Sequence, residues 1–402
     1  MLYEEIVCSS QSDFRKGGRL YATALSKCEK GECKVTTRRD FISFGTAAAA
    51  FAAFGQEANV RKAKSRSALL HLGQNMWGGY LAPGEKKEPG LRYTADHLRT
   101  DETVWRSLTD LMVARKYNMA VIDVGEGLIY PSHPELAVKG SWSAEKLAAE
   151  VKRLKEQGIE AIPKLNFSAC HDGWLKMYGR MLSTDKYRVV VKELIDDVCK
   201  VFGNPRYFHL GLDEEDADMQ RRDPFVVIRR GGAWWKDFYH YLDCLSAHGA
   251  RAIVFPGEDA RESPEIFRKR MPKDVIQNPW MYGHGHDYKQ LLEWGKMRPY
   301  RLKQAKTMEM FKRFGEDGYT VLACVSNWVH KAKIPKPWPT GKDYPQDPEA
   351  IAWFWDHISN AVPDALLMGA MVAPWGEIKP ELELYWKCGI NQLADVFDSQ
   401  GC

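Results

Sequence analysis

From about residue 68 onward, the chain alternates short apolar segments with amphipathic helical segments, and this alternation repeats eight times. Strands that alternate regularly with helices indicate a parallel sheet whose strands are joined by right-handed crossovers. We expect strands at 69–75, 119–124, 160–166, 207–212, 250–256, 275–280, 320–326 and 366–373. We expect helices at 102–117, 143–157, 185–202, 232–248, 265–270, 300–314, 348–359 and 380–397.

Eight such units in about 330 residues predict an α/β fold, the (β/α)8 or TIM barrel, formed by a single domain over residues 67–402. Continuous apolar strands, such as the one around Ile253, fit a sheet whose outer face is covered by helices. A doubly wound open sheet is the alternative. It would require a glycine-rich phosphate-binding turn after the first strand, and the segment 73–79 lacks that glycine spacing.

We interpret residues 1–60 as a leader that contains a twin-arginine signal segment. Arg38 and Arg39 precede an alanine-rich apolar segment that is too short to span a bilayer stably. Such a signal predicts export of the folded protein across the inner membrane of a bacterium, to the periplasm or the exterior. The mature protein is not expected to insert into a membrane. An ordinary amphipathic helix at this position is the alternative interpretation.

Overall composition narrows the range of partners. The 57 basic residues nearly balance the 53 acidic ones, which gives no support to binding of nucleic acid or of a membrane surface. The aromatic fraction of 12%, with 14 tryptophans, is high, and tryptophan rings often stack on flat apolar ligand faces such as those of sugars.

The candidate site begins with four consecutive acids, Asp213 to Asp216, at the end of the fourth expected strand. A buried core does not explain these acids, because neighbouring carboxylates repel each other and are costly to desolvate. In a (β/α)8 barrel the reactive face is built from the carboxyl ends of the strands. Strand alternation places His209, Gly211 and Asp213 on one face, and Glu214 lies where the strand turns into its loop. A glycine at 211 leaves room for a substrate or a neighbouring side chain.

Two adjacent acids do not both ionise with ordinary affinity. One of the pair Asp213 and Glu214 is therefore expected to have a raised pKa and to donate a proton at neutral pH. Cleavage of a glycosidic bond needs such an acid together with a carboxylate that stabilises the oxocarbenium-like transition state. The following acids, Glu215, Asp216 and Asp218, are expected to be solvated residues in the first turn of the next helix.

The pattern His209-x-Gly211-x-Asp213-Glu214 resembles the strand-four signature of glycoside hydrolase family 20, the β-N-acetylhexosaminidases, whose catalytic domain is a (β/α)8 barrel. The resemblance implies a retaining, substrate-assisted reaction. Glu214 would act as general acid and then as general base. Asp213 would orient and stabilise the substrate's 2-acetamido group, whose carbonyl oxygen attacks the anomeric carbon.

A second motif lies on the eighth expected strand, which ends in Trp375-x-Glu377 and is similar to the Trp-x-Glu at the end of that family's last strand. The resemblance implies that Trp375 packs against the sugar and that Glu377 hydrogen-bonds to it. It covers about residues 68–400, and these two motifs are its specific part. The other residues expected to bind substrate are Asp123, Asn166, His171, His209, Trp280, Tyr282 and Trp328.

The chain departs from the family pattern at several positions. The first strand lacks the arginine that usually grips sugar hydroxyls, the third lacks the family's acid, and Leu212 replaces a small residue before Asp213. Tyr282 is the best candidate for the tyrosine that hydrogen-bonds the acetamido oxygen. These departures leave open whether the substrate must carry an N-acetyl group.

Three alternatives to this function remain. One is a glycosidase with an ordinary carboxylate nucleophile, for which Glu126, Glu258 and Glu377 are candidates. Another is a metal-dependent barrel hydrolase or isomerase built on the acidic cluster and the histidines, among which His284 and His286 form a His-x-His pair. The third is a carbohydrate-binding barrel without turnover. Our main expectation is an enzyme that acts on an oligosaccharide or glycan without a cofactor or a metal, and the oligomeric state is not predicted.

Overall fold

The computed structural model describes residues 64–81, 84, 94–215, 229–282, 299–327 and 350–401, with the backbone alone at 299–305 and 350. Residues 63–402 group into one compact unit. The predicted leader with Arg38 and Arg39 lies outside the described residues, as do Trp328, His284 and His286.

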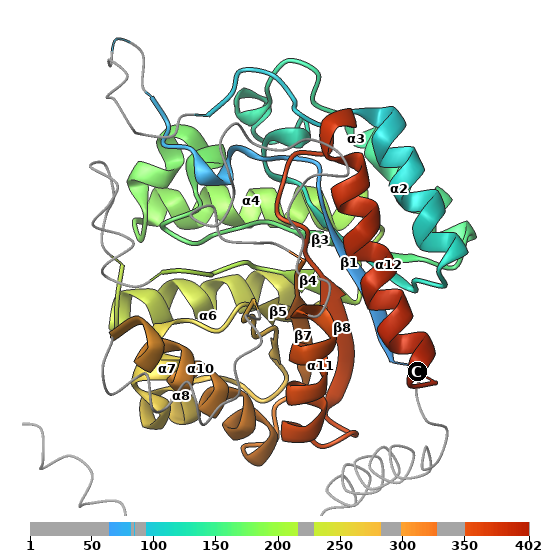
Figure 1. The fold of residues 1–402 in the computed structure, drawn as a ribbon. Coiled ribbons are helices and arrows are strands. Elements are labelled where there is room, and N and C mark those ends of the chain that lie inside the picture. Colours follow the sequence, from blue (N-terminus) through green and yellow to red (C-terminus); the bar gives the residue numbers. More distant parts are fainter. Residues whose placement is uncertain are drawn as a thin grey trace, which may run out of the picture. The chain divides into compact units, whose positions relative to one another are not determined.

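Eight parallel strands form a closed barrel in which each strand pairs with the next and β8 pairs with β1 (Figure 1). The strands are β1 (Ser65–His71), β2 (Met119–Asp123), β3 (Glu160–Lys164), β4 (Tyr207–His209), β5 (Arg251–Val254), β6 (Ile276–Gln277), β7 (Val321–Val325) and β8 (Leu367–Val372). This topology confirms the predicted (β/α)8 fold.

Helices alternate with the strands along the chain and pack around the outside of the barrel (Figure 1). They are α2 (Glu102–Ala114), α3 (Ala144–Glu156), α4 (Asp185–Val201), α6 (Gly232–Ser246), α7 (Glu258–Glu262), α8 (Pro264–Arg270), α10 (Pro299–Glu316), α11 (Ala350–Ala361) and α12 (Glu383–Ser399). Side-chain caps fix several starts: Asp101 accepts hydrogen bonds from the backbone of Thr103 and Val104, and Ser143 accepts one from Lys146. No helix among the described residues is long and apolar enough to cross a bilayer.

The segments after several strands form short 3-10 helices. They are η1 (Asn75–Trp77), η2 (Gly125–Gly127), η3 (Pro134–Leu136), η4 (Gly173–Met181) and η7 (Pro380–Leu382). The predicted helix 380–397 included η7, but the sequence pattern predicted neither the other four turns nor α7, which precedes α8. Short polar turns carry no sustained periodicity, so periodicity alone does not reveal them.

The predicted range of the first strand, 69–75, was wrong at both ends. β1 starts four residues earlier and ends at His71. The N–H groups of Leu72 and Gly73 both donate to the carbonyl of Asp123, at 2.9 and 3.0 Å, which ends the regular ladder. The polar residues that follow lie in η1, above the end of the barrel, and so become available to the candidate site.

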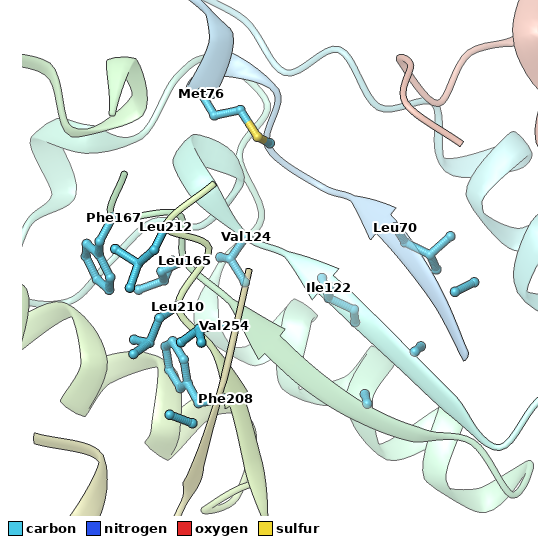
Figure 2. Close-up of a cluster of buried hydrophobic side chains, with 14 of the residues drawn as sticks. Leu70, Met76, Ile122, Val124, Leu165, Phe167, Phe208, Leu210, Leu212 and Val254 are labelled. Carbon is cyan, nitrogen blue, oxygen red and sulfur yellow. The ribbon is translucent and has the colours of Figure 1, made fainter. Parts of the chain in front are cut away.

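Alternate strand residues face two separate apolar cores. Outward-facing side chains such as Leu70, Ile122 and Phe208 pack against the helices and belong to the cluster in Figure 2. The side chains that fill the barrel include Leu69, Val121, Ile162, Ile253, Leu322 and Met371. The barrel interior is therefore a packed core, and the polar side chains at its carboxyl end are the ones left for chemistry.

Candidate active site

The two predicted catalytic acids lie in a turn that begins where β4 ends. We expected this strand to continue to residue 212, but it ends at His209, because Gly211 and Leu212 have φ of 71° and Glu214 has φ of 55°. Backbone in this left-handed region breaks the two-residue alternation of a strand. The turn buries Asp213, which is 7% exposed, while the side chain of Glu214 is 37% exposed.

Leu212 anchors this turn on the outer core. Its side chain is fully buried and lies beside Leu165 and Phe167 of the segment after β3 (Figure 2). A leucine in the left-handed region is uncommon, because its Cβ then crowds the backbone. Burial of the apolar side chain holds this unusual backbone in place, whereas the carboxylate of the next residue, Asp213, contacts polar groups.

Asn166, a predicted site residue after β3, holds the turn from the other side. Its amide Nδ2 donates to Asp213 Oδ1 at 2.9 Å, and its Oδ1 accepts the backbone N–H of Leu212 at 3.2 Å. Ser168 adds a hydrogen bond from its hydroxyl to the carbonyl of Asp213, at 2.7 Å. Gly211 makes this close approach possible, since a Cβ there would lie 2.1 Å from Asn166 Oδ1.

His171 lies between the two acids. Its Nδ1 is 3.3 Å from Asp213 Oδ2, and its Nε2 is 3.5 Å from Glu214 Oε2. Burial by itself lowers the pKa of His171, but the negative charges of Asp213 and Glu214 outweigh burial and raise that pKa to about 10. The imidazole is therefore a cation at neutral pH and lies between the two acids.

The environment of Asp213 keeps this acid ionised. Burial alone would raise its pKa, but the charge of His171, with support from Lys164 and Asn166, holds the pKa of Asp213 well below its usual range. The two adjacent acids thus differ in burial and in partners. Asp213 is the permanent anion of the pair, and Glu214 is the acid that solvent and a ligand can reach.

A layer of polar side chains closes the barrel beneath the acids. His71, Asp123, Lys164 and His209 stand in register on adjacent strands β1 to β4, and none is more than 1% exposed. Asp123 forms an ion pair with Lys164 and lies 3.4 Å from His71. Burial alone would raise the pKa of Asp123, but Lys164 and His71 together outweigh burial and lower that pKa.

His209 is a neutral member of this layer. Its Nδ1 accepts the backbone N–H of Gly211 at 3.0 Å, so its Nε2 carries the proton and donates to Asn278 Oδ1 at 3.1 Å. Burial, reinforced by the positive charge of Lys164, lowers the pKa of His209 to about 3. Like Asp123, His209 is fully engaged with the protein and lies under the surface on which we expected both to bind substrate.

Aromatic side chains from three segments meet at the same end of the barrel. Trp375, after β8, donates its indole N–H to the hydroxyl of Tyr282 at 2.5 Å, and its ring is 5.7 Å from that of Trp77 in η1. Trp280 stacks on Tyr282 with ring centroids 5.3 Å apart. Burial chiefly raises the pKa of Tyr282, and the charge of Asp213 acts in the same direction, so this phenol stays protonated at neutral pH.

The predicted sugar-binding carboxylate, Glu377, already has two cationic partners. Its Oε1 is 3.3 Å from Arg99, in the segment before α2, and its Oε2 is 2.5 Å from Lys379. Arg99 also donates to Asn75 Oδ1 at 3.1 Å. Sequence reasoning missed Arg99, since 278 residues separate it from Glu377 and no local pattern pairs them.

Two other predicted carboxylates, Glu126 and Glu258, already have partners within the protein. Glu126 is 1% exposed, and its Oε1 accepts the backbone N–H groups of Gln74 and Asn75 at 2.7 and 3.0 Å. Burial raises the pKa of Glu126, although these donors oppose the shift. Glu258 begins α7 and forms an ion pair of 2.8 Å with Arg230.

Glu215 corrects one expectation. We predicted a solvated acid in the first turn of the next helix, but Glu215 is 4% exposed. Its carboxylate forms a bidentate pair with Arg229, at 2.7 and 3.0 Å, and accepts the indole N–H of Trp234 at 3.1 Å. A short run of acids in a sequence does not reveal which of them has a buried partner farther along the chain.

Within the ranges that the structure describes, no group of three or more His, Cys, Asp or Glu side chains is arranged to hold a metal ion. The predicted alternative that used His284 and His286 falls outside those ranges.

Comparison with solved structures finds this fold in family 20 glycoside hydrolases. The GH20 β-N-acetylhexosaminidase from Streptomyces coelicolor A3(2) matches with a TM-score of 0.51 and 12% identity, over 84% of this chain and 69% of that one. The GH20 exo-β-N-acetylglucosaminidase from Vibrio harveyi matches with a TM-score of 0.49 and 13% identity, over 84% and 58%. The β-N-acetylhexosaminidase from Bacteroides fragilis NCTC 9343 matches with a TM-score of 0.48 and 17% identity, over 81% and 65%.

This chain therefore spans 58% to 69% of the length of these three proteins. No protein-family model and no curated protein sequence matches it. At such low identities the likeness concerns the fold of the barrel, as the strand pattern predicted. The chemistry has to be argued from the side chains themselves.

Proposed function

We propose that the protein is a glycoside hydrolase that cleaves β-hexosides, N-acetyl-β-hexosaminides among them, by a retaining and substrate-assisted mechanism. The observation that carries the proposal is the unequal pair of acids: Asp213 is buried and held ionised, while Glu214, beside it, is partly exposed. A site of this kind separates the two tasks that glycosidic cleavage requires.

Glu214 is the general acid and base in this proposal. In the first step its carboxyl group donates a proton to the leaving oxygen while the substrate's acetamido oxygen attacks the anomeric carbon. In the second step the Glu214 carboxylate takes a proton from water, which attacks the same carbon and restores the original configuration. Because about a third of its side chain is exposed, Glu214 is accessible both to the leaving oxygen of the substrate and to the attacking water.

Asp213 remains an anion throughout the cycle. Its carboxylate accepts a hydrogen bond from the acetamido N–H and stabilises the positive charge that develops on this group when the carbonyl oxygen becomes the nucleophile. Asn166 and His171 fix its orientation, at 2.9 and 3.3 Å. His209 and Asp123 support the site from below and do not touch substrate in this proposal.

The aromatic group supplies the sugar-binding surface. Trp375, Trp77 and Trp280 offer apolar ring faces for the sugar, and Trp328 is proposed as a further wall. Tyr282 accepts the indole N–H of Trp375, and in this proposal its hydroxyl donates to the acetamido oxygen once the substrate is bound.

Glu377 and its partner Arg99 supply polar contacts to sugar hydroxyls in this proposal. We also propose, from the Arg38-Arg39 segment, that the protein is exported in folded form to the periplasm or the exterior. Replacing both arginines with lysine should retain the protein in the cytoplasm of a bacterial host, and fractionation that still finds it outside would contradict export by this route.

A screen of the purified protein against aryl β-hexosides with and without the 2-acetamido group tests the function. Glu214→Gln should lower turnover by about 10² to 10⁴-fold on hexosides of both classes that carry a poor leaving group, because a general acid contributes that much. Asp213→Asn should lower turnover mainly on acetamido substrates. Equal losses on both substrate classes would indicate an enzyme nucleophile. Sugar binding without any turnover would favour the binding-only barrel, and inactivation by a chelator would favour the metal-dependent one.

A further inference from the structure

The acid Glu214 is followed directly by an ion pair that is buried in the protein. Arg229 is 1% exposed and donates from Nε to Glu215 Oε1 at 2.7 Å and from Nη2 to Glu215 Oε2 at 3.0 Å. It lies fourteen residues farther along the chain, at the other end of the segment that follows Glu215. Such a bidentate arginine–carboxylate pair fixes the orientation of both groups as well as the distance between them.

The guanidinium also contacts helix α6 and the segment after β3. It donates to Asp237 Oδ2 at 3.2 Å and to the hydroxyl of Tyr241 at 2.6 Å, both in α6, and to the carbonyl of Phe167 at 2.7 Å. Asp237 is paired in turn with Arg188 of α4, at 3.1 Å. The charges alternate from Glu215 to Arg188, so a buried and balanced chain connects the turn after β4 to the outer helices.

Glu214 is thus fixed on both sides in the sequence. Asp213, before it, is bound by Asn166 and His171, and Glu215, after it, is bound by Arg229 and by the indole N–H of Trp234. Between these anchors the Glu214 backbone has φ of 55°, a conformation that a glutamate adopts only when its surroundings impose it.

We propose that Arg229 and Glu215 are positioning residues that hold Glu214 in its left-handed conformation and so aim its carboxyl group at the leaving oxygen. This inference rests on the proposed function and deepens it. Neither residue needs to touch the substrate. Their effect on the reaction passes through the backbone of Glu214, and a displacement of about 1 Å in a catalytic group can cost about 100-fold in rate.

The experiment compares Glu215→Gln with Asp237→Asn in the full-length protein. Each change removes one negative charge from the same guanidinium without changing side-chain size, but only Glu215 adjoins the catalytic acid. Two aryl N-acetyl-β-hexosaminides serve as probes, one with the activated dinitrophenyl leaving group and one with a poor leaving group such as methoxyphenyl. The poor leaving group needs protonation by Glu214, and the activated one does not.

For Glu215→Gln we expect kcat to fall about tenfold or more on the poor leaving group and less than about threefold on the activated one, with little change in KM, because only the acid is misaligned. Asp237→Asn should change both rates by the same factor. Equal effects on the two leaving groups in Glu215→Gln would overturn the inference, since loss of folded protein scales both rates together.

Glu214→Gln in the same assay separates this inference from the proposed function. If Glu214→Gln shows a strong leaving-group dependence and Glu215→Gln shows none, only the positioning role is refuted. If Glu214→Gln itself shows no leaving-group dependence, both the positioning role and the proposed role of Glu214 are refuted. If Glu215→Gln does not fold, Trp234→Phe provides the test. It removes only the indole donor to Glu215 and keeps an aromatic ring next to Phe238, whose centroid is 5.0 Å away. In Trp234→Phe we expect kcat to fall more on the poor leaving group than on the activated one, by a smaller factor than in Glu215→Gln. An equal fall on the two leaving groups would overturn the proposal.

Discussion

Gly211 offers a direct test of how the candidate site is assembled. A Cβ atom at this position would lie 2.1 Å from Oδ1, 2.5 Å from Cγ and 2.8 Å from Cα of Asn166, and real Cβ atoms essentially never approach another atom more closely than 3.0 Å. Asn166 binds both the backbone of Leu212 and the carboxylate of Asp213. Gly211→Ala must therefore displace the residue that orients the proposed acetamido-stabilising acid.

Two contributions set the size of the effect. An alanine in the left-handed region, at φ of 71°, costs about 1–2 kcal/mol. Forcing a methyl group into a filled site costs about 1–3 kcal/mol more. We expect the free energy of unfolding to fall by about 2–5 kcal/mol. Turnover should fall about tenfold to a hundredfold, because Asp213 loses its fixed orientation.

Gly203→Ala is the matched control. Gly203 has φ of 69°, and an added Cβ would meet no atom within 4 Å. This variant should show the backbone cost alone, about 1–2 kcal/mol, with unchanged turnover. Urea unfolding followed by tryptophan fluorescence measures stability, and kinetics on an aryl N-acetyl-β-hexosaminide measure function. Unchanged m-values would show that stability, and not compactness of the unfolded state, has changed.

If Gly211→Ala loses no more stability and no more turnover than Gly203→Ala, that result refutes the argument. It would show that crowding against Asn166 has no consequence. A further check combines Gly211→Ala with Asn166→Ala, which deletes the Oδ1 and Cγ atoms that the new methyl group would meet but leaves the Cα of residue 166, at 2.8 Å. The double variant should regain part of the lost stability without regaining turnover.

Two further predictions concern His171 and Tyr282. Because the folded-state pKa of His171 is raised to about 10, its pairing stabilises the protein fully below about pH 6.5 and less as the pH rises through 10. The stability gap between the natural protein and His171→Asn, on the order of a few kcal/mol at pH 6, should therefore shrink toward pH 10 in urea unfolding, and a constant gap would contradict the pairing. Tyr282→Phe should lower kcat/KM on acetamido substrates by about tenfold, as expected for one lost hydrogen bond of about 1.5 kcal/mol, and should leave plain hexosides nearly unchanged. Equal losses on both would assign the phenol to packing instead.

Local sequence properties were sufficient to predict the architecture. Hydrophobic periodicity identified the eight strand and helix units, because apolar faces must repeat every two or every 3.6 residues to be buried. The rule that strand ends form the reactive face then brought Asn166, His171 and Asp213 into one candidate site, and the structure places them in contact. The ends of the strands were predicted less well, since the turn at Gly211 depends on the neighbouring Asn166.

The electrostatic character of the site was decided by tertiary structure alone. The sequence from 213 to 216 presents equivalent acids, yet Asp213 is held ionised by His171, Glu214 remains accessible, and Glu215 is buried against Arg229. Burial and charge at short range determine a pKa, and both depend on residues that are distant in the chain. The sequence therefore determined where the acids would gather, and only the folded barrel distinguished the buried anion, the accessible acid and the buried partner of Arg229.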